Sequence, residues 1–200
     1  MTLVKICGLT HAEDVRATLA AGADWLGFIH VPGTPRHRSR EELIPLLAAA
    51  EGAVRVLVVR NADEETLAEL RATLPFEHFQ FHGDEPADYL TRFGGYKVFH
   101  IEASDNRPTP PDTFGTPYLL DTAVRGMRGG TGKTFAWDIL ADMPRKFLVA
   151  GGLTPENVGD LVAAYRPWGV DVCSGVEASP GRKDLRKLKH FIENVRRQDS

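Results

Sequence analysis

Residues 4–8 read VKICG and decide the expected fold, because they place a thiol and a glycine at the end of a short apolar strand. The same order of strand, polar residue or glycine turn, and helix recurs along the chain. Other expected strands end in Gln80 and His82, in Asp121, in Gly151-Gly152 and in Asp171. In a parallel α/β barrel these ends meet on one rim, which is where such barrels keep their active sites. The pattern therefore indicates an enzyme.

Short β-branched runs alternate with helical periodicity over the whole chain. Strands are predicted near 3–7, 25–30, 54–59, 77–82, 96–101, 116–121, 146–150 and 169–173. Helices are predicted near 11–21, 40–51, 63–73, 86–93, 134–141, 154–165 and 184–197. After the fifth strand, prolines 108, 110 and 111 favour a loop over a helix.

Eight strand units in 200 residues favour an α/β fold with a single domain, 1–200, that closes as a (β/α)8 TIM barrel. In this barrel a proline-rich loop replaces the helix after strand five. An open, doubly wound sheet is the alternative fold.

Composition excludes several classes of protein. The net charge of −3 offers no basic surface for nucleic acid or for a membrane. The first residues run directly into a strand, so no signal peptide is expected, and no apolar run approaches the roughly 20 residues that span a bilayer. Cys7 and Cys173 are far apart in the sequence, which argues against a disulfide scaffold or a structural zinc site. We expect a cytoplasmic protein.

Strand alternation assigns faces in the first strand. Val4 and Ile6 suit the layer between barrel and helices, which leaves Lys5 and Cys7 pointing inward. Because strand eight lies beside strand one in a closed barrel, we expect Lys5 to pair with Asp171. A nearby ammonium lowers the pKa of a thiol and favours the reactive thiolate. Cys7 is thus either a nucleophilic or basic group or a small buried apolar residue, and position alone weighs the two equally.

Two other polar residues have a functional and an ordinary interpretation. Asp121 ends the apolar strand Tyr118-Leu119-Leu120 and is either a loop cap or a catalytic acid. Arg36 lies in the basic loop 34–39, where it either clamps a carboxylate through its planar guanidinium or is simply solvated.

Glycine-rich loops follow strands six, seven and eight, at 129–133, 151–152 and 174–175. Glycine lets backbone amides approach an anion, and barrels often hold phosphate near strands seven and eight. Three such loops in succession favour a phosphorylated ligand. A nucleotide-binding P-loop is disfavoured, because Met127 stands where its first glycine is needed.

Taken together, these segments resemble the phosphoribosylanthranilate isomerase family of tryptophan biosynthesis. The matching segments are KICGLT (5–10), DWLGFI (24–29), TPRHRS (34–39), FQFHGDE (79–85), YLLD (118–121), GGTGKTFAW (129–137), VAGGLTPENV (149–158) and DVCSGVEASPGRKD (171–184). The resemblance implies a TIM barrel that catalyses an Amadori rearrangement, with Asp121 as general acid and Cys7 as general base. It implies a substrate pocket of Arg36, Gln80, His82 and Asp171, and phosphate binding by Gly130, Gly132, Gly151, Gly152, Ser174 and Gly175.

The resemblance also implies that no metal or organic cofactor is needed and that the substrate is a small phosphorylated molecule. The protein is expected to be a monomer or a homodimer, and the sequence does not decide between the two. His30 and Cys173 depart from the family pattern, which has an aromatic residue and a serine there. Thr34 and Phe81 are milder departures.

Two alternative functions remain open. One is a related sugar-phosphate isomerase of histidine biosynthesis, or an enzyme that serves both pathways; these use a pair of aspartates, and Cys7 argues against them. The other is a catalytically inactive barrel that binds a phosphorylated ligand.

Overall fold

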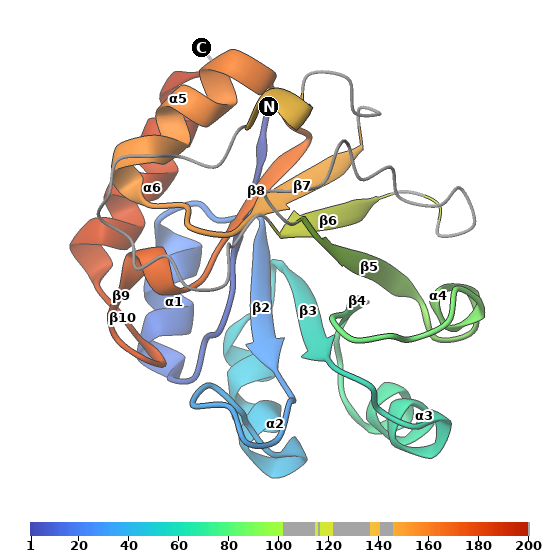
Figure 1. Ribbon diagram of the computed structural model, residues 1–200. Helices are drawn as coiled ribbons and strands as arrows, with labels where there is room; N and C mark the ends of the chain where they lie inside the picture. The colour runs from blue at the N-terminus through green and yellow to red at the C-terminus, as the bar shows by residue number, and fades with distance from the viewer. Residues whose placement is uncertain (102–114, 116, 122–136, 141–145, 200) are drawn as a thin grey trace.

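Eight parallel strands close into a barrel in the computed structural model, which describes residues 1–101, 115, 117–121, 137–140 and 146–199 (Figure 1). The strands are β1 Leu3–Ile6, β2 Trp25–Ile29, β3 Val54–Val59, β4 His78–Phe81, β5 Gly95–His100, β6 Tyr118–Asp121, β7 Phe147–Ala150 and β8 Gly169–Val172. β8 pairs with β1, with Lys5 opposite Asp171, and this pairing closes the barrel. The predicted (β/α)8 architecture is confirmed, with each strand at its expected place.

Helices cover the outside of the barrel. They are α1 Ala12–Ala20, α2 Arg40–Ala49, α3 Glu64–Thr73, α4 Asp88–Phe93, α5 Pro155–Tyr165 and α6 Leu185–Arg197. The predicted start of α5 is confirmed: Thr154 and Asn157 form a reciprocal capping pair, and Pro155 opens the helix. Of the helix expected near 134–141, the described part, Trp137–Leu140, is a 3₁₀ turn. The proline-rich segment after β5 lies outside the described residues.

Side chains alternate between two apolar layers, as the sequence predicts for β1. Val4 and Ile6 are fully buried in the large layer between strands and helices. A second cluster, which includes Trp25, Tyr96 and Leu148, fills the barrel interior. Trp25 packs its ring 5.8 Å from that of Tyr96. Apolar side chains thus fill much of the barrel interior, and inward polar side chains line the cavity at the carboxyl ends of the strands.

One element is not foreseen in the sequence. After the 3₁₀ turn Ser174–Val176, strands β9 Glu177–Ser179 and β10 Arg182–Lys183 form a small antiparallel hairpin. Gly181 turns the hairpin with φ +83°, and its carbonyl accepts a hydrogen bond from the Thr10 hydroxyl. The hairpin is thereby fixed against the loop that follows β1.

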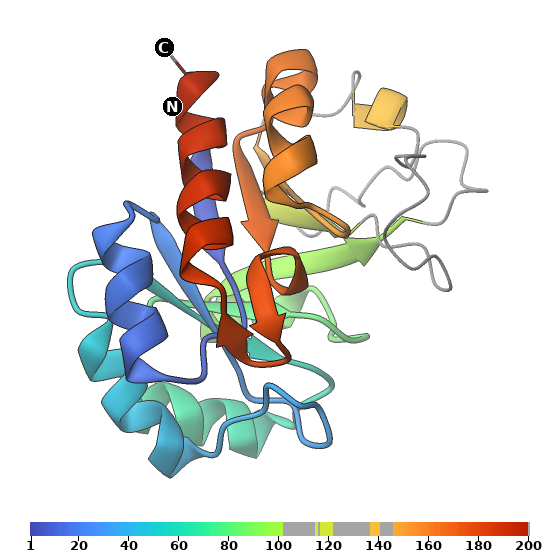
Figure 2. The same cartoon turned by 90° about the vertical axis from the view of Figure 1, so that its left-hand side faces the viewer.

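The N- and C-terminal residues of the chain lie side by side (Figure 2). They are at the end of the barrel where the strands begin, away from the carboxyl ends of the strands. The Thr2 amide donates to the Asp199 carboxylate at 2.9 Å. Among the described residues, no helix combines the length and the apolar character needed to cross a membrane.

Candidate active site

A cavity of about 280 Å³ opens at the carboxyl ends of the strands. It collects every predicted site residue that the structure describes. These are Cys7, Arg36, Gln80, His82, Asp121, Gly151, Gly152, Asp171, Ser174 and Gly175. Gly130 and Gly132 lie outside the described residues. Side chains from all parts of the sequence thus share one pocket, as expected for the rim of a barrel.

Cys7 follows β1 directly and is almost completely buried, with 4% of its surface exposed. Its backbone N–H donates to the Val172 carbonyl at 2.9 Å, which fixes the residue against β8. The pKa of Cys7 lies well below its usual value, chiefly because the Cys173 thiol donates a hydrogen bond to it; burial opposes this, and Lys5 adds to the lowering. The neighbours therefore favour the thiolate, which is the reactive form.

Lys5 and Asp171 form the pair expected from strand alternation. Lys5 Nζ donates to Asp171 Oδ1 at 2.9 Å, and both side chains are buried. Burial lowers the pKa of Lys5, but the negative charge of Asp171 and Cys7 outweighs it and raises that pKa overall. Burial also raises the pKa of Asp171 to about 7, against the pull of Lys5. The ammonium of Lys5 is thus held beside Cys7, where it favours the thiolate.

Gly27 on β2 leaves the space in which these groups meet. A Cβ atom at this position would lie 2.8 Å from Cys7 Sγ and 3.0 Å from Lys5 Nζ. Both distances are shorter than ordinary van der Waals contacts allow. The ammonium and the sulfur therefore converge over a residue without a side chain, within range for the charge of Lys5 to stabilise a thiolate.

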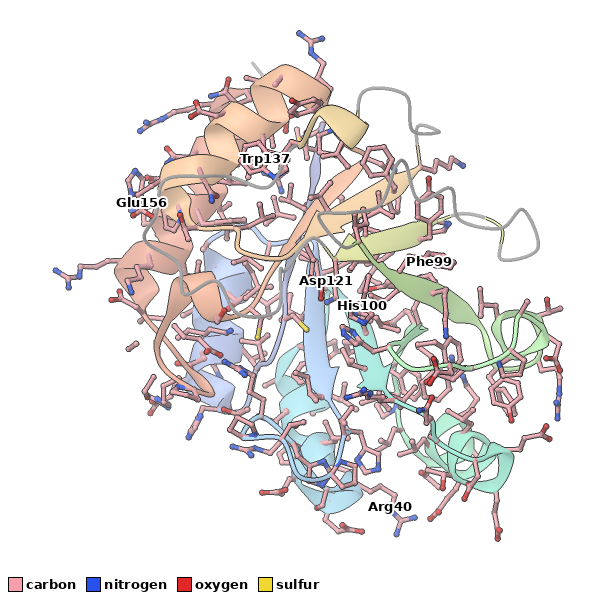
Figure 3. All side chains as sticks on the ribbon, viewed as in Figure 1. Arg40, Phe99, His100, Asp121, Trp137 and Glu156 are labelled. Atoms are coloured by element: carbon pink, nitrogen blue, oxygen red, sulfur yellow. The ribbon has the colours of Figure 1, made fainter. Side chains whose placement is uncertain are left out.

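Asp121 ends β6, where its carboxylate faces two imidazole rings. Asp121 Oδ2 lies 3.9 Å from His82 Nε2 and 3.8 Å from His100 Nδ1. Figure 3 shows His100 and Asp121 side by side at the ends of their strands. The pKa of His82 is lowered, first by burial and then by His100, although Asp121 raises it. A neutral imidazole thus lies beside the carboxyl group.

Gln80 is buried below His82 and is held by a neighbour on the next strand. Tyr96 Oη donates to Gln80 Oε1 at 2.8 Å. Because the side-chain oxygen of Gln80 is the acceptor, its amide nitrogen is left as the group able to donate to a ligand.

His30, which departs from the family pattern, does not line the cavity. Its Nδ1 lies 2.8 Å from the Arg38 carbonyl oxygen.

Arg36 enters the cavity from the loop after β2, but two of its nitrogens already bind Glu177. Nε lies 2.8 Å from Oε1 and Nη2 2.5 Å from Oε2. Glu177 also accepts from Lys183 Nζ at 3.3 Å and from the Gly181 amide at 3.2 Å. Sequence analysis missed Glu177 and Lys183, although the Pro-Gly pair at 180–181 marks the turn that brings them together.

The loops after β7 and β8 are shaped by glycine. Gly151 and Gly152 have φ +90° and +65°, which favour a residue without a Cβ. A Cβ at Gly175 would lie 1.8 Å from the Leu153 carbonyl oxygen, so the two loops pack directly on each other. The backbone of these loops lines the cavity and forms a wall suited to an anion.

Comparison with known proteins gives consistent matches over nearly the whole chain. The family model described as N-(5'phosphoribosyl)anthranilate (PRA) isomerase matches residues 4–194. The N-(5'-phosphoribosyl)anthranilate isomerase of Acidithiobacillus ferrooxidans is 39% identical over 201 residues, covering 98% of each chain. The crystal structure of phosphoribosyl anthranilate isomerase from Thermotoga maritima has a TM-score of 0.85 at 32% identity and covers 98% of this chain and 99% of its own. A crystal structure of a phosphoribosyl anthranilate isomerase in complex with reduced 1-(o-carboxyphenylamino)-1-deoxyribulose 5-phosphate has a TM-score of 0.81 at 31% identity, with the same coverage.

Proposed function

The chain belongs to the N-(5'-phosphoribosyl)anthranilate isomerase family, and we propose that it converts N-(5-phosphoribosyl)anthranilate to 1-(2-carboxyphenylamino)-1-deoxyribulose 5-phosphate in tryptophan biosynthesis. One observation carries the proposal: a buried thiol with a lowered pKa and a carboxyl group line the same cavity as the glycine loops. The similar structure that contains a reduced form of the named product supports a phosphorylated substrate.

The reaction needs an acid and a base that act on neighbouring atoms. Asp121 donates a proton to the ring oxygen of the furanose, the bond from that oxygen to the anomeric carbon breaks, and the nitrogen lone pair forms an iminium. The iminium acidifies the adjacent carbon, and Cys7 as thiolate removes its proton. The resulting enolamine tautomerises to the ketone. No atoms enter or leave, so only the two proton-transfer groups are required.

Binding of the substrate is assigned to the polar lining of the cavity. Arg36 binds the anthranilate carboxylate, and Asp171 contacts the anthranilate amine. Gln80 and His82 line the sugar region, and the loops with Gly130, Gly132, Gly151, Gly152, Ser174 and Gly175 hold the phosphate. Because Nε and Nη2 of Arg36 are engaged by Glu177, the substrate carboxylate meets a guanidinium whose direction is already fixed.

Arg36→Ala is expected to weaken substrate binding with little change in kcat. A hydrogen bond to a charged group contributes about 1.5–3 kcal/mol, which corresponds to a rise in KM of roughly 10- to 100-fold. Steady-state kinetics measures both constants. Arg40→Ala is the matched control, because Arg40 pairs with Glu41 and Glu69 at the surface, away from the cavity (Figure 3). A fall in kcat with KM unchanged would contradict the assigned role.

Cys173 is expected to set the pH at which the enzyme becomes active. Cys173→Ala removes the hydrogen bond that most lowers the pKa of Cys7, so the acidic limb of the kcat/KM profile should move to higher pH. Cys173→Ser keeps a donor and should move the limb less. An unchanged limb in Cys173→Ala would show that this hydrogen bond does not tune the base.

The function itself is tested with freshly generated phosphoribosylanthranilate and the purified protein. Conversion supports the proposal. Turnover of the corresponding histidine-pathway substrate would indicate a bifunctional enzyme, and ligand binding without any turnover would indicate an inactive binding barrel. Four further points stay predictions. They are a single domain over residues 1–200, a reaction without a cofactor, a monomer or homodimer, and a cytoplasmic location.

A further inference from the structure

Three side chains of the types that bind metals lie together beside the cavity, and two of them, His82 and Asp121, line it. His82 follows β4 directly, His100 is the last residue of β5, and Asp121 is the last residue of β6. One nitrogen of each imidazole and one carboxylate oxygen lie within 4.8 Å of one another. In the part of the chain that the structure describes, no other group of three such residues is this close. Figure 3 shows the His100 ring and the Asp121 carboxylate directed toward the same space.

The spacing of these atoms suits a shared ion better than direct hydrogen bonds. The two nitrogen–oxygen distances of 3.8 Å and 3.9 Å exceed the range of about 2.7–3.2 Å for a hydrogen bond. Ligands placed tetrahedrally about 2.0–2.1 Å from Zn²⁺ lie roughly 3.4 Å from one another. Small rotations of the three side chains therefore suffice to enclose an ion between them.

Neighbouring, paired strands carry these side chains, at or directly after the last residue of each strand. His100 and Asp121 are register partners in adjacent strands, and β4 pairs with β5. The His82 and His100 rings meet edge to face at 4.8 Å between centroids. Sites built on strands hold their geometry better than sites on loops.

We propose that His82, His100 and Asp121 bind a divalent transition metal such as Zn²⁺, and that the bound ion inhibits the isomerase. Two imidazoles and one carboxylate favour Zn²⁺, Ni²⁺ or Cu²⁺ over Mg²⁺ and Ca²⁺, which prefer oxygen ligands alone. A carboxylate that coordinates an ion cannot donate a proton, and the ion fills the space above it. Inhibition is therefore competitive with substrate. This second half of the inference rests on the proposed role of Asp121.

The Cys7 thiolate could also bind such ions. The test therefore has to distinguish an ion at His82, His100 and Asp121 from an ion at Cys7. Co²⁺ is the probe, because its visible absorption reports coordination by nitrogen and oxygen, while a thiolate ligand adds an intense near-ultraviolet band. The protein is freed of metal with a chelator and titrated with Co²⁺, and turnover is then measured with increasing Zn²⁺. His100→Asn removes one ligand at an exposed position and leaves Cys7 and Asp121 in place. His190→Asn, on the exposed face of α6, is the matched control.

The wild type and His190→Asn should bind Co²⁺ without a thiolate band and should be inhibited by Zn²⁺ competitively. In His100→Asn both the Co²⁺ affinity and the sensitivity to Zn²⁺ should fall at least tenfold, since losing even an outer-shell partner costs roughly 10- to 100-fold in affinity. Turnover of each variant without metal is the baseline against which its inhibition by Zn²⁺ is measured.

Equal Co²⁺ affinity in the wild type and His100→Asn would overturn the metal site. A thiolate band that disappears in Cys7→Ser would also overturn it and would move the ion to the thiol. Binding that is lost in His100→Asn but that never inhibits turnover would overturn the inhibitory half alone. That outcome is distinct from failure of the proposed function, which shows as the absence of turnover in metal-free protein.

Discussion

Cys7→Ser is expected to lower kcat by about 10²–10⁴-fold, the contribution that a positioned general base makes. A serine hydroxyl has nearly the size of the thiol, but at neutral pH it is not ionised, whereas the neighbours of Cys7 lower the pKa of its thiol well below the usual value. The substrate contacts stay in place, so KM should change little. Steady-state turnover of freshly generated phosphoribosylanthranilate by wild type and variant, side by side, gives both constants.

Cys173→Ser is the matched control, because it makes the same atomic change at the neighbouring position and should keep most of the activity at neutral pH. Binding of a product analogue, measured by calorimetry, should be similar in wild type and Cys7→Ser, which separates a lost base from a damaged pocket. If Cys7→Ser turns over as fast as the wild type, the chain remains an isomerase and the assignment of the base is wrong.

The charged interior of β1 is predictable from sequence because strand alternation leaves few choices. Val4 and Ile6 must face the apolar layer, so Lys5 and Cys7 face inward, and closure of the barrel then brings Lys5 to Asp171 across 166 positions of the chain. The predicted pair is confirmed, with 2.9 Å between Lys5 Nζ and Asp171 Oδ1. In the same way, strand ends that carry polar residues predict which side chains share the cavity.

Contacts that depend on a loop conformation cannot be predicted from strand alternation and topology. Arg36 and Glu177 are 141 positions apart, and neither belongs to a strand of the barrel, so no periodicity connects them. Lys183 is buried in a two-residue strand, too short to give a pattern. His100 ends β5, where alternation no longer assigns a face. Its approach to Asp121 is set by the register between β5 and β6, which the sequence does not specify.

Asp121→Asn is expected to reduce kcat by about 10²–10⁴-fold as well, for the complementary reason. An amide matches the carboxyl group in shape, so the fold and the position beside His82 and His100 are kept, but it has no acidic proton to give to the ring oxygen. Ring opening, which precedes proton removal at the neighbouring carbon, then becomes the slow step. Steady-state kinetics should show the loss in kcat, with KM changed only modestly.

The double variant Cys7→Ser/Asp121→Asn tests whether the two groups act in one sequence of steps. Residues that act as a unit give strongly non-additive losses, so the double variant should be little slower than the slower single variant. A product of the two separate losses would mean that each residue acts independently of the other. Near-normal kcat in Asp121→Asn would instead mean that another group is the acid. The His82 imidazole would then be the first group to replace, because its Nε2 lies 3.9 Å from Asp121 Oδ2 and it lines the same cavity.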